Sequence, residues 1–454
     1  YKLLDKNIGK YVWNTHPHRD RIVPIGEREL RILAKTFENS DDWETAKLVS
    51  IHSRQILSVL EKLSAFPTKV EDVISMTSEG FHETNAQDKN IIKRETGFPD
   101  YEKCELIYSG PHFFVGNPLY KTPRTVCSQN SHYDEIDLTR IPEDFLPRTN
   151  YKPAEDLLTF KRRIGGLKQI GKDKNGKALY DPWVDYFKCC FSKMLDKSTE
   201  RTLQPAIASP KVSYTNGVIS VIFANEENLI EFQGVTSSVV YDFFVKTIGR
   251  GNLYDDTLQN FPVGITEKFK SPIFLRTLLL NCLTRPYAPL WERHWQPDWP
   301  QESWSKEDAR LKPFTALSGV WTWHTPLRNA FERRQALVEI DVITAMALGL
   351  TLEELILIYE VQFPVLQQNE DDTWYDRKGN IVFTCSKGLT GTGVDRKTWE
   401  EIRNLNEGET YTHIIDPQRS ELYGGMEVVY EAPFERCDRV ADYRGAWGWF
   451  CQLF

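Results

Sequence analysis

The spacing of apolar residues changes twice along this 454-residue chain, and these changes constrain its fold more than any single motif. Apolar residues recur at helical spacing over residues 27–63, and residues 39–42 divide the stretch into two helices, the second capped by Ser40 or Asp41. Over residues 70–261, short β-favouring runs alternate with turn signals. Helical spacing then returns. This order predicts an α+β chain of several domains.

Local signals place individual elements within this pattern. Asn175-Gly176 and Asn216-Gly217 each predict a hairpin turn. Residues 218–223 read as a strand, and residues 374–383 as a β-hairpin. The predicted helices cover residues 235–248, a segment opened by Ser271-Pro272, and residues 327–348 and 352–363, the last with a capping box at Thr351.

A length of 454 residues predicts two or three domains. We expect an N-terminal helical segment (1–69), an irregular β-rich α+β domain (70–285) and a mainly helical domain with a β-hairpin (286–454). No apolar window approaches the length of about 18 residues that a membrane helix needs, so no membrane partner is expected. The eight cysteines form no C-x-x-C pair, which indicates the reducing cytoplasm and no metal site.

The distribution of charge is more informative than its sum. The chain carries a net charge of −8, which alone argues against a nucleic-acid partner. Residues 151–250 nevertheless hold 15 Lys or Arg and 11 Asp or Glu, a net of +4, whereas residues 361–454 hold 10 and 16, a net of −6. An electropositive middle between acidic flanks is compatible with a local site for a polyanion.

The chain contains no complete catalytic motif, so no catalytic residue is assigned. Phosphate-binding glycine loops, nucleophile elbows and H-E-x-x-H helices are absent from the sequence, and the glycine-rich residues 388–393 read as a plain loop. His16-Pro17-His18 has no third metal ligand at a suitable spacing and reads as an exposed loop.

One short segment resembles a base pocket. Asn117, Pro118 and Tyr120 follow the [DNS]-P-P-[YFW] signature of amino-methyltransferases, with Leu119 in place of the second proline. In that signature the amide and the following carbonyl accept hydrogen bonds from the target amine, and the aromatic ring stacks on the flipped base. The alternative is a turn that only looks like the signature.

A basic run follows in the middle of the chain. Residues 161–177 contain seven cations and a single acid, Asp173, and their glycines make the segment loop-like. The cations are Lys161, Arg162, Arg163, Lys168, Lys172, Lys174 and Lys177. Such loops can follow a phosphate backbone. The alternative is a solvated surface loop.

Longer phrases resemble a known family. They are GFHETNAQ (80–87), SGPHFFVGNP (109–118), LPRTNY (146–151), SSVVYDFFVK (237–246), FLRTLLLN (274–281) and DTWYD (372–376). Over roughly residues 70–443 the chain resembles the C-terminal half of very large bacterial class I adenine-specific DNA methyltransferases. These enzymes belong to type IIG-like restriction and phage-defence systems.

The resemblance implies that this chain recognises the DNA target. Its partners would be double-stranded DNA, a methyltransferase catalytic domain in the same or another chain, and other defence-system subunits. S-adenosylmethionine would be the cofactor of the system, bound mostly outside this chain. Candidates for DNA contact are Lys121, Arg124, Gln129, Asn130 and Arg148, together with the basic run.

Two other functions stay open. The chain could be a self-contained, divergent DNA methyltransferase that uses residues 117–120 as its pocket. It could also be an interaction scaffold in a multi-subunit defence complex, with the acidic residues 361–454 facing a protein partner.

Overall fold

The structure is a computed structural model that describes residues 2–5, 10–13, 23–49, 51, 55–172, 174, 176, 178–386 and 393–454. Within these ranges, fourteen α-helices accompany eighteen short strands, which form one four-stranded sheet and seven two-stranded pairs. This mixture confirms the predicted α+β class. No helix in the described ranges is both long and apolar enough to cross a membrane.

The N-terminal segment holds a strand pair, β1 (Lys2–Asp5) and β2 (Lys10–Trp13), and two helices, α1 (Glu27–Glu38) and α2 (Gln55–Ser64). The prediction that the second helix starts at Ser40 or Asp41 is wrong. Asn39 ends α1 in the left-handed conformation, and the Ser40 hydroxyl accepts a hydrogen bond from the backbone N–H of Asp42. Side-chain-to-backbone bonds of this kind compete with helix formation, and residues 41–49 hold one turn at 44–45 and no helix.

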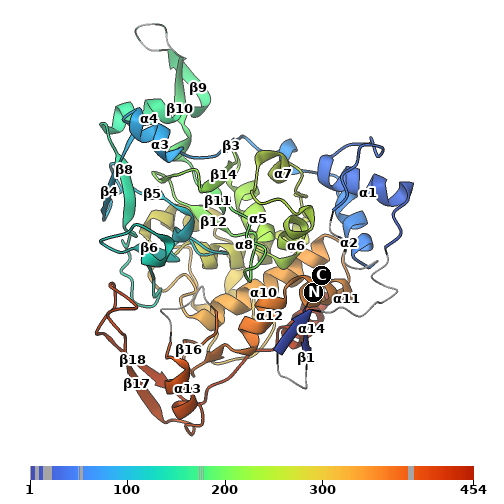
Figure 1. Ribbon diagram of the computed structural model, residues 1–454, viewed down its shortest axis with the longest axis vertical. Helices are drawn as coiled ribbons and strands as arrows, with labels where there is room; N and C mark the ends of the chain where they lie inside the picture. Colours follow the sequence, from blue (N-terminus) through green and yellow to red (C-terminus); the bar gives the residue numbers. More distant parts are fainter. Residues whose placement is uncertain are drawn as a thin grey trace.

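A four-stranded antiparallel sheet lies at the centre of the molecule (Figure 1). Its order is β12 (Pro205–Ala208), β11 (Lys188–Ser192), β14 (Val218–Ile222) and β3 (Met76–Ser78). Alternate residues of β11 and β14 enter two different hydrophobic clusters: Cys189 and Val221 face one, Cys190 and Ile222 the other. Because both faces are covered, β14 is apolar almost throughout, and its predicted position is confirmed.

Smaller strand pairs surround this sheet. They are β4 (Ile92–Gly97) with β8 (Thr149–Pro153), β5 (Ile107–Tyr108) with β13 (Ser213–Tyr214), β6 (Lys121–Pro123) with β7 (Tyr133–Glu135), and β9 (Gly166–Lys172) with β10 (Ala178–Pro182). The β9–β10 pair confirms the hairpin predicted around Gly176. The hairpin predicted at Asn216-Gly217 is wrong, because β13 pairs in parallel with β5 while β14 pairs with β11 and β3.

Helices α3 (Glu83–Asp88) and α4 (Leu157–Ile164) lie beside these pairs, and the β9–β10 hairpin projects beyond them as a free arm (Figure 1). Short 3-10 helices connect other elements: η2 (Val70–Asp72), η3 (Gly110–His112), η4 (Asn130–His132), η5 (Trp183–Asp185), η6 (Arg285–Tyr287), η7 (Trp299–Gln301) and η8 (Phe314–Ala316).

Ten helices follow in the second half of the chain. They are α5 (Glu226–Thr236), α6 (Val239–Ile248), α7 (Asp255–Gln259), α8 (Glu267–Asn281), α9 (Ala288–His294), α10 (Ala330–Ala347), α11 (Leu352–Gln362), α12 (Pro364–Asp371), α13 (Arg396–Ile402) and α14 (Arg439–Leu453). Helix α8 packs against α5 and α10, and α10 packs against α14. The predicted capping box at Thr351 is confirmed as the start of α11.

Two helix boundaries differ from their prediction. The single helix expected over residues 235–248 is two helices, because the Ser238 hydroxyl caps α6 through the backbone N–H of Tyr241. Helix α8 begins at Glu267 and carries Pro272 in its interior, so Ser271-Pro272 does not open it. Burial of α8 on most sides stabilises it despite the internal proline.

The largest hydrophobic cluster takes in Leu33, Phe232, Leu278, Ile340 and Phe450, so it draws on all three predicted segments. The predicted boundaries at residues 69 and 285 stay predictions. Buried ion pairs cross the same core, among them Arg276–Glu339 and Arg439–Asp341. Buried charges need such partners, because desolvation of a lone charge is costly.

The C-terminal part adds two hairpins. The pair β15 (Trp374–Tyr375) and β16 (Ile381–Phe383) confirms the hairpin predicted over residues 374–383. The pair β17 (Thr410–Ile414) and β18 (Glu427–Glu431) projects at the opposite end of the molecule from β9–β10 (Figure 1). Its connecting loop, residues 415–426, returns to the β6–β7 pair.

Candidate nucleic-acid interface

A groove of about 1380 Å³ is lined by residues of the β-rich segment and of residues 365–386. Many of its polar side chains are amides, and these come from distant parts of the chain: Gln129, Asn130, Asn150, Gln204, Asn216, Gln368 and Asn369. An amide both donates and accepts hydrogen bonds, which is the property that reading the edges of base pairs requires. The groove therefore has the chemistry of a base-reading surface.

Three of these amides are exposed. Gln129 occupies the N-cap position of η4, and its Nε2 atom lies 3.1 Å from the Nε2 atom of His132. Asn130 and Gln368 have no side-chain hydrogen bond within the described ranges. By contrast, Asn369 donates to Glu200, and Asn216 accepts from Lys193 at 3.0 Å. Gln129, Asn130 and Gln368 are thus the exposed amides of the groove, and of these Asn130 and Gln368 have no side-chain partner among the described residues.

The charges that line the groove do not make it basic. Two cations, Arg94 and Lys121, line it together with three carboxyl groups, those of Glu83, Asp196 and Glu200. Lys121 also lies 3.6 Å from Glu135 and 4.9 Å from the centre of the Tyr120 ring.

Burial modifies this balance at Glu200. It raises the pKa of the Glu200 carboxyl, although Asn369 and Ser386 donate hydrogen bonds to it. The charged side chains that line the groove therefore give it no excess of positive charge.

Two predicted DNA contacts, Arg124 and Arg148, have partners within the protein. Arg124 lies 2.7 Å from Asp134, and Arg148 lies 2.8 Å from Glu421. The Glu421 carboxylate also accepts hydrogen bonds from Thr125. These contacts hold the loop between β17 and β18 against β6–β7, so the two guanidinium groups serve a structural role in this fold.

The basic run divides between α4 and the β9–β10 hairpin. Lys161 pairs with Asp185 at 2.6 Å, and Arg163 with Glu155 at 2.8 Å. Arg162, Lys172 and Lys174 are exposed and form no ion pair with any described residue. The Lys168 side chain and Lys177 lie outside the described residues. Three cations of the run therefore face solvent on or beside the projecting arm.

The Asn117–Tyr120 segment forms a tight turn. The backbone groups of Phe114 and Asn117 bond each other, and the Asn117 Oδ1 accepts a hydrogen bond from the N–H of Leu119 at 3.0 Å. The carbonyl of the buried Pro118 accepts one from the Tyr108 hydroxyl at 2.9 Å. Both oxygens that the methyltransferase signature offers to a target amine thus have partners in the protein, which favours a structural turn.

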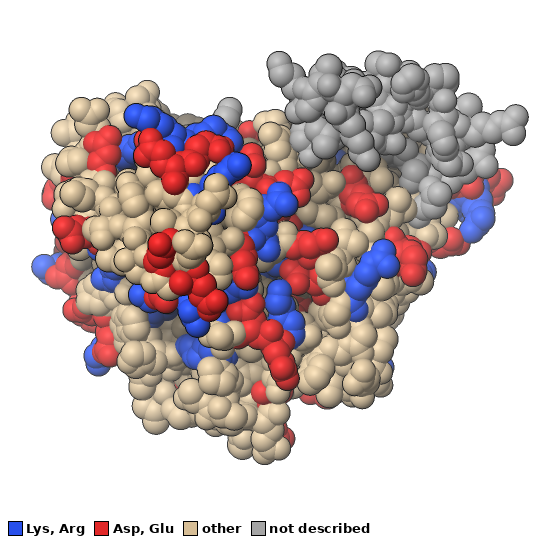
Figure 2. Space-filling model, turned by 90° about the horizontal axis from the view of Figure 1, so that it is seen from below, with Lys and Arg blue, Asp and Glu red and all other residues tan. Residues whose placement is uncertain are grey.

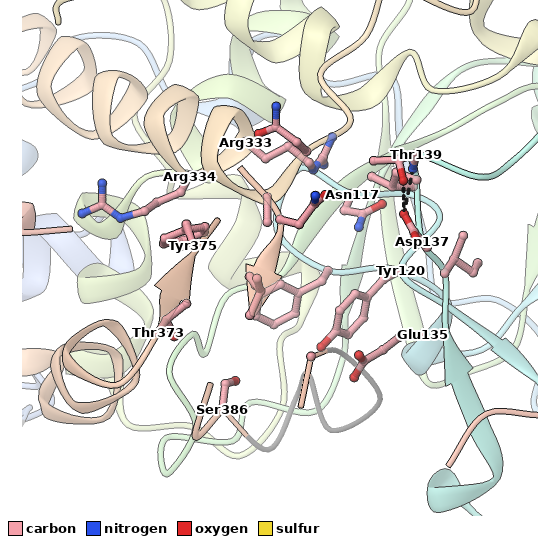
Figure 3. A pocket seen from close by; sticks show the side chains of 18 of the residues that line it. Asn117, Tyr120, Glu135, Asp137, Thr139, Arg333, Arg334, Thr373, Tyr375 and Ser386 are labelled. Atoms are coloured by element: carbon pink, nitrogen blue, oxygen red, sulfur yellow. Dashed lines mark hydrogen bonds between the residues drawn. The ribbon is translucent and has the colours of Figure 1, made fainter. Parts of the chain in front are cut away.

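Asn117 and Tyr120 nevertheless line a smaller cavity beside the groove (Figure 3). Tyr120 also lines the groove itself, so the two spaces are neighbours. Burial raises the pKa of the Tyr120 hydroxyl well above its ordinary value, which keeps it neutral. Pro118 does not line the cavity.

The face seen from below carries Lys and Arg side chains interspersed with Asp and Glu (Figure 2). Among its described residues no extended single-sign surface is visible in that view. Such a face is not expected to follow a phosphate backbone.

The described residues do not fit S-adenosylmethionine. Dinucleotide-type cofactor sites lie at the carboxyl ends of parallel strands next to a glycine-rich turn. The central sheet is antiparallel, and the one parallel pair in the described ranges, β5–β13, spans two residues on each strand. In these ranges no group of three or more His, Cys, Asp and Glu side chains is placed to hold a metal, and His16-Pro17-His18 lies outside them.

Sequence reasoning missed Gln368, because one exposed amide within a short helix carries no local signal. It also missed two arginines of the smaller cavity, Arg328 and Arg333, since their lack of acidic partners shows only in three dimensions. In comparisons with known proteins, no family model matches this chain and no curated protein matches it.

Proposed function

We propose that this chain is the sequence-specific DNA-recognition part of an N6-adenine DNA methyltransferase system. It would act in the cytoplasm, beside a methyltransferase catalytic domain in the same or another chain and alongside other defence subunits. S-adenosylmethionine is assigned to that catalytic domain, because the described residues do not fit it. The free thiols of all eight cysteines support a reducing compartment.

The groove lined by amides carries the proposal. Gln129, Asn130 and Gln368 lie exposed along one continuous surface, and amides pair with adenine in both donor and acceptor sense. Helix α4 presents Arg162 to solvent, and the neighbouring β9–β10 arm presents Lys172 and Lys174. In this proposal the groove contacts the bases, and α4 and the arm contact the phosphates.

Fluorescence anisotropy of a labelled DNA duplex, titrated at several salt concentrations, tests this division. We expect binding that weakens steeply with salt, because each neutralised phosphate releases counterions. Changing Arg162, Lys172 and Lys174 to Glu should make the plot of log affinity against log salt less steep. The slope should decrease in magnitude by about one for each phosphate that is no longer neutralised.

A matched control variant changes three exposed cations on other parts of the surface to Glu. They are Arg28, Lys47 and Arg377, whose side chains are 72%, 76% and 53% exposed. The control should keep the wild-type slope. No binding at low salt, or equal losses of affinity in both variants, would contradict the proposal.

An interaction scaffold is the second candidate, and one observation favours it. The strands of the β17–β18 hairpin expose Ile414 and Val429, which are 62% and 44% accessible, and the connecting loop exposes Met426, which is 43% accessible. Exposed apolar side chains on a projecting hairpin suit a protein partner. Absence of duplex binding by wild-type protein would move the assignment to this function.

A further inference from the structure

A cavity of about 340 Å³ lies beside the groove. Its walls come from the 114–120 turn, β7, the start of α10 and the two C-terminal hairpins. Figure 3 shows Asn117, Tyr120 and Glu135 on one side of this space and Thr373, Tyr375 and Ser386 on the other. Five aromatic side chains are among the lining residues: Phe114, Tyr120, Tyr375, Tyr423 and Tyr430. The volume is at the lower end of small-molecule sites.

Arg333 lies at this cavity without an acidic partner. Its Nη1 donates to the carbonyls of Leu280 and Leu327 at 3.0 and 2.9 Å, and its Nη2 to that of Gly116 at 2.8 Å. A guanidinium has five N–H donors. The Nε–H and one N–H of Nη2 therefore have no partner among the described residues, and Figure 3 shows the side chain next to Asn117.

Arg328 is a second cation of this kind. It is 8% exposed, and its three nitrogens donate to the carbonyls of Trp323, Leu138 and Leu283 at 2.8–3.0 Å. Burial lowers the pKa of Arg328 to about 10. Burial and the neighbouring Arg328 cation together lower the pKa of Arg333 to about 9. The two guanidinium groups thus repel each other, and no described carboxylate lies within ion-pair distance of either.

The other arginines at the cavity are neutralised. Arg201 pairs with Asp242, Arg334 with Glu370, and Arg439 with Asp341. The lining carboxylates are likewise engaged: Glu135 with Lys121, Asp137 with Arg140, and Glu370 with Arg334 and Arg439. The lining carboxyl that has no cation at ion-pair distance, Glu200, has a raised pKa. Arg328 and Arg333 therefore leave an excess of positive charge in this space.

We propose that this cavity binds a free nucleoside monophosphate, with Arg333 and Arg328 on its phosphate and the aromatic walls on its base. Two cations match a phosphate monoester of nearly two negative charges better than a carboxylate of one. A guanidinium holds phosphate oxygens through paired N–H donors. Aromatic walls suit a planar base, which inorganic phosphate lacks. This inference does not depend on DNA binding by the groove.

Isothermal titration calorimetry of the full chain tests the site, with adenosine monophosphate, adenosine and inorganic phosphate as probes. We expect the nucleotide to bind at least about tenfold more tightly than either part alone. Arg333→Gln should abolish the advantage over adenosine. Arg28→Gln, at a side chain that is 72% exposed on α1, should leave it unchanged.

Because Arg333 holds three backbone carbonyls, its loss can also weaken folding. Asn117→Asp is therefore a second variant. Aspartate keeps the acceptor for the N–H of Leu119 but places a carboxylate beside Arg333. It should weaken nucleotide binding about tenfold and leave adenosine binding unchanged. Equal affinity of the wild type for nucleotide and adenosine, no binding at millimolar nucleotide, or full binding by Asn117→Asp would overturn the proposal.

Discussion

The Nη1 atom of Arg148 lies 2.8 Å from Oε1 of Glu421, although 273 residues separate them in the sequence. Through this pair the loop that joins β17 and β18 is held against the β6–β7 strands, where Asp134 also accepts the N–H groups of Glu421 and Leu422. The pair therefore joins the C-terminal hairpin to the β-rich segment.

A double-mutant cycle on Arg148→Ala and Glu421→Ala should give a coupling energy of about 0.5–1 kcal/mol, because both side chains are partly solvated. Urea unfolding of the wild type, both single variants and the double variant measures it. Strictly additive losses would show that the ion pair contributes nothing to the free energy of unfolding.

Acid should destabilise the core through Glu370. Burial alone would raise the pKa of this carboxyl, but Arg334 and Arg439, at 2.9 and 3.0 Å, outweigh burial and lower the pKa to about 2. A carboxyl with a depressed folded pKa stabilises the protein above its unfolded pKa, and this stability is lost as pH falls through the folded pKa. We expect a loss on the order of 3 kcal/mol between about pH 5 and pH 2.

Urea unfolding at stepped pH, on the wild type and on Glu370→Gln, measures this loss. Glutamine cannot ionise, so the difference in unfolding free energy between the two proteins should shrink as pH falls. A difference that stays constant from neutral pH to acid would contradict the assignment.

The contact between α5 and α8 requires glycine at position 234. A Cβ there would lie 2.4 Å from Cγ2 of Ile273 and 2.5 Å from Oγ1 of Thr277. Gly234→Ala should therefore lower the free energy of unfolding by about 1–3 kcal/mol. Gly445→Ala on α14 is the control, since a Cβ there meets nothing within 4 Å, and it should stabilise by about 0.5–1 kcal/mol.

Both variants are followed by thermal and urea unfolding. A Gly234→Ala protein as stable as the wild type would mean that α5 and α8 are less closely packed than this structure has them.

The exposed amides of the groove should control sequence preference. Changing Gln129, Asn130 and Gln368 together to Ala should weaken binding to the specific duplex relative to non-specific DNA. The difference in binding free energy between the two should shrink by about 1–3 kcal/mol for each base that is no longer read. The salt dependence should change little, because amides do not neutralise phosphates. Competition binding with specific and scrambled duplexes distinguishes the two effects; a reduction in affinity that is equal on both would exclude base reading.

Patterns local in sequence predicted the fold class, the Thr351 cap and the β9–β10 hairpin, because each depends on neighbouring residues. The start of α8 was mispredicted, since Ser271-Pro272 fits a helix start but tertiary packing extends the helix back to Glu267. Non-local pairing was also hidden: the sequence offered Arg148 as a candidate for DNA contact and gave no sign that Glu421 lies beside it.

The candidate site shows the same limit. Gln129, Asn130 and the exposed cations were predicted from the sequence as polar surface residues, and the structure places them at the surface. It gave no indication of Arg328 and Arg333, because an arginine that lacks a carboxylate partner is recognised only when all its neighbours are known.

Selection of binding sites from a library of random DNA duplexes tests sequence-specific recognition most directly. The wild-type chain, incubated with the library at moderate salt, should enrich one short motif over successive rounds. The variant with Gln129, Asn130 and Gln368 changed to Ala should retain DNA without enriching that motif. Retention of DNA by the wild type with no motif enriched, or no retention at all, would contradict the recognition function.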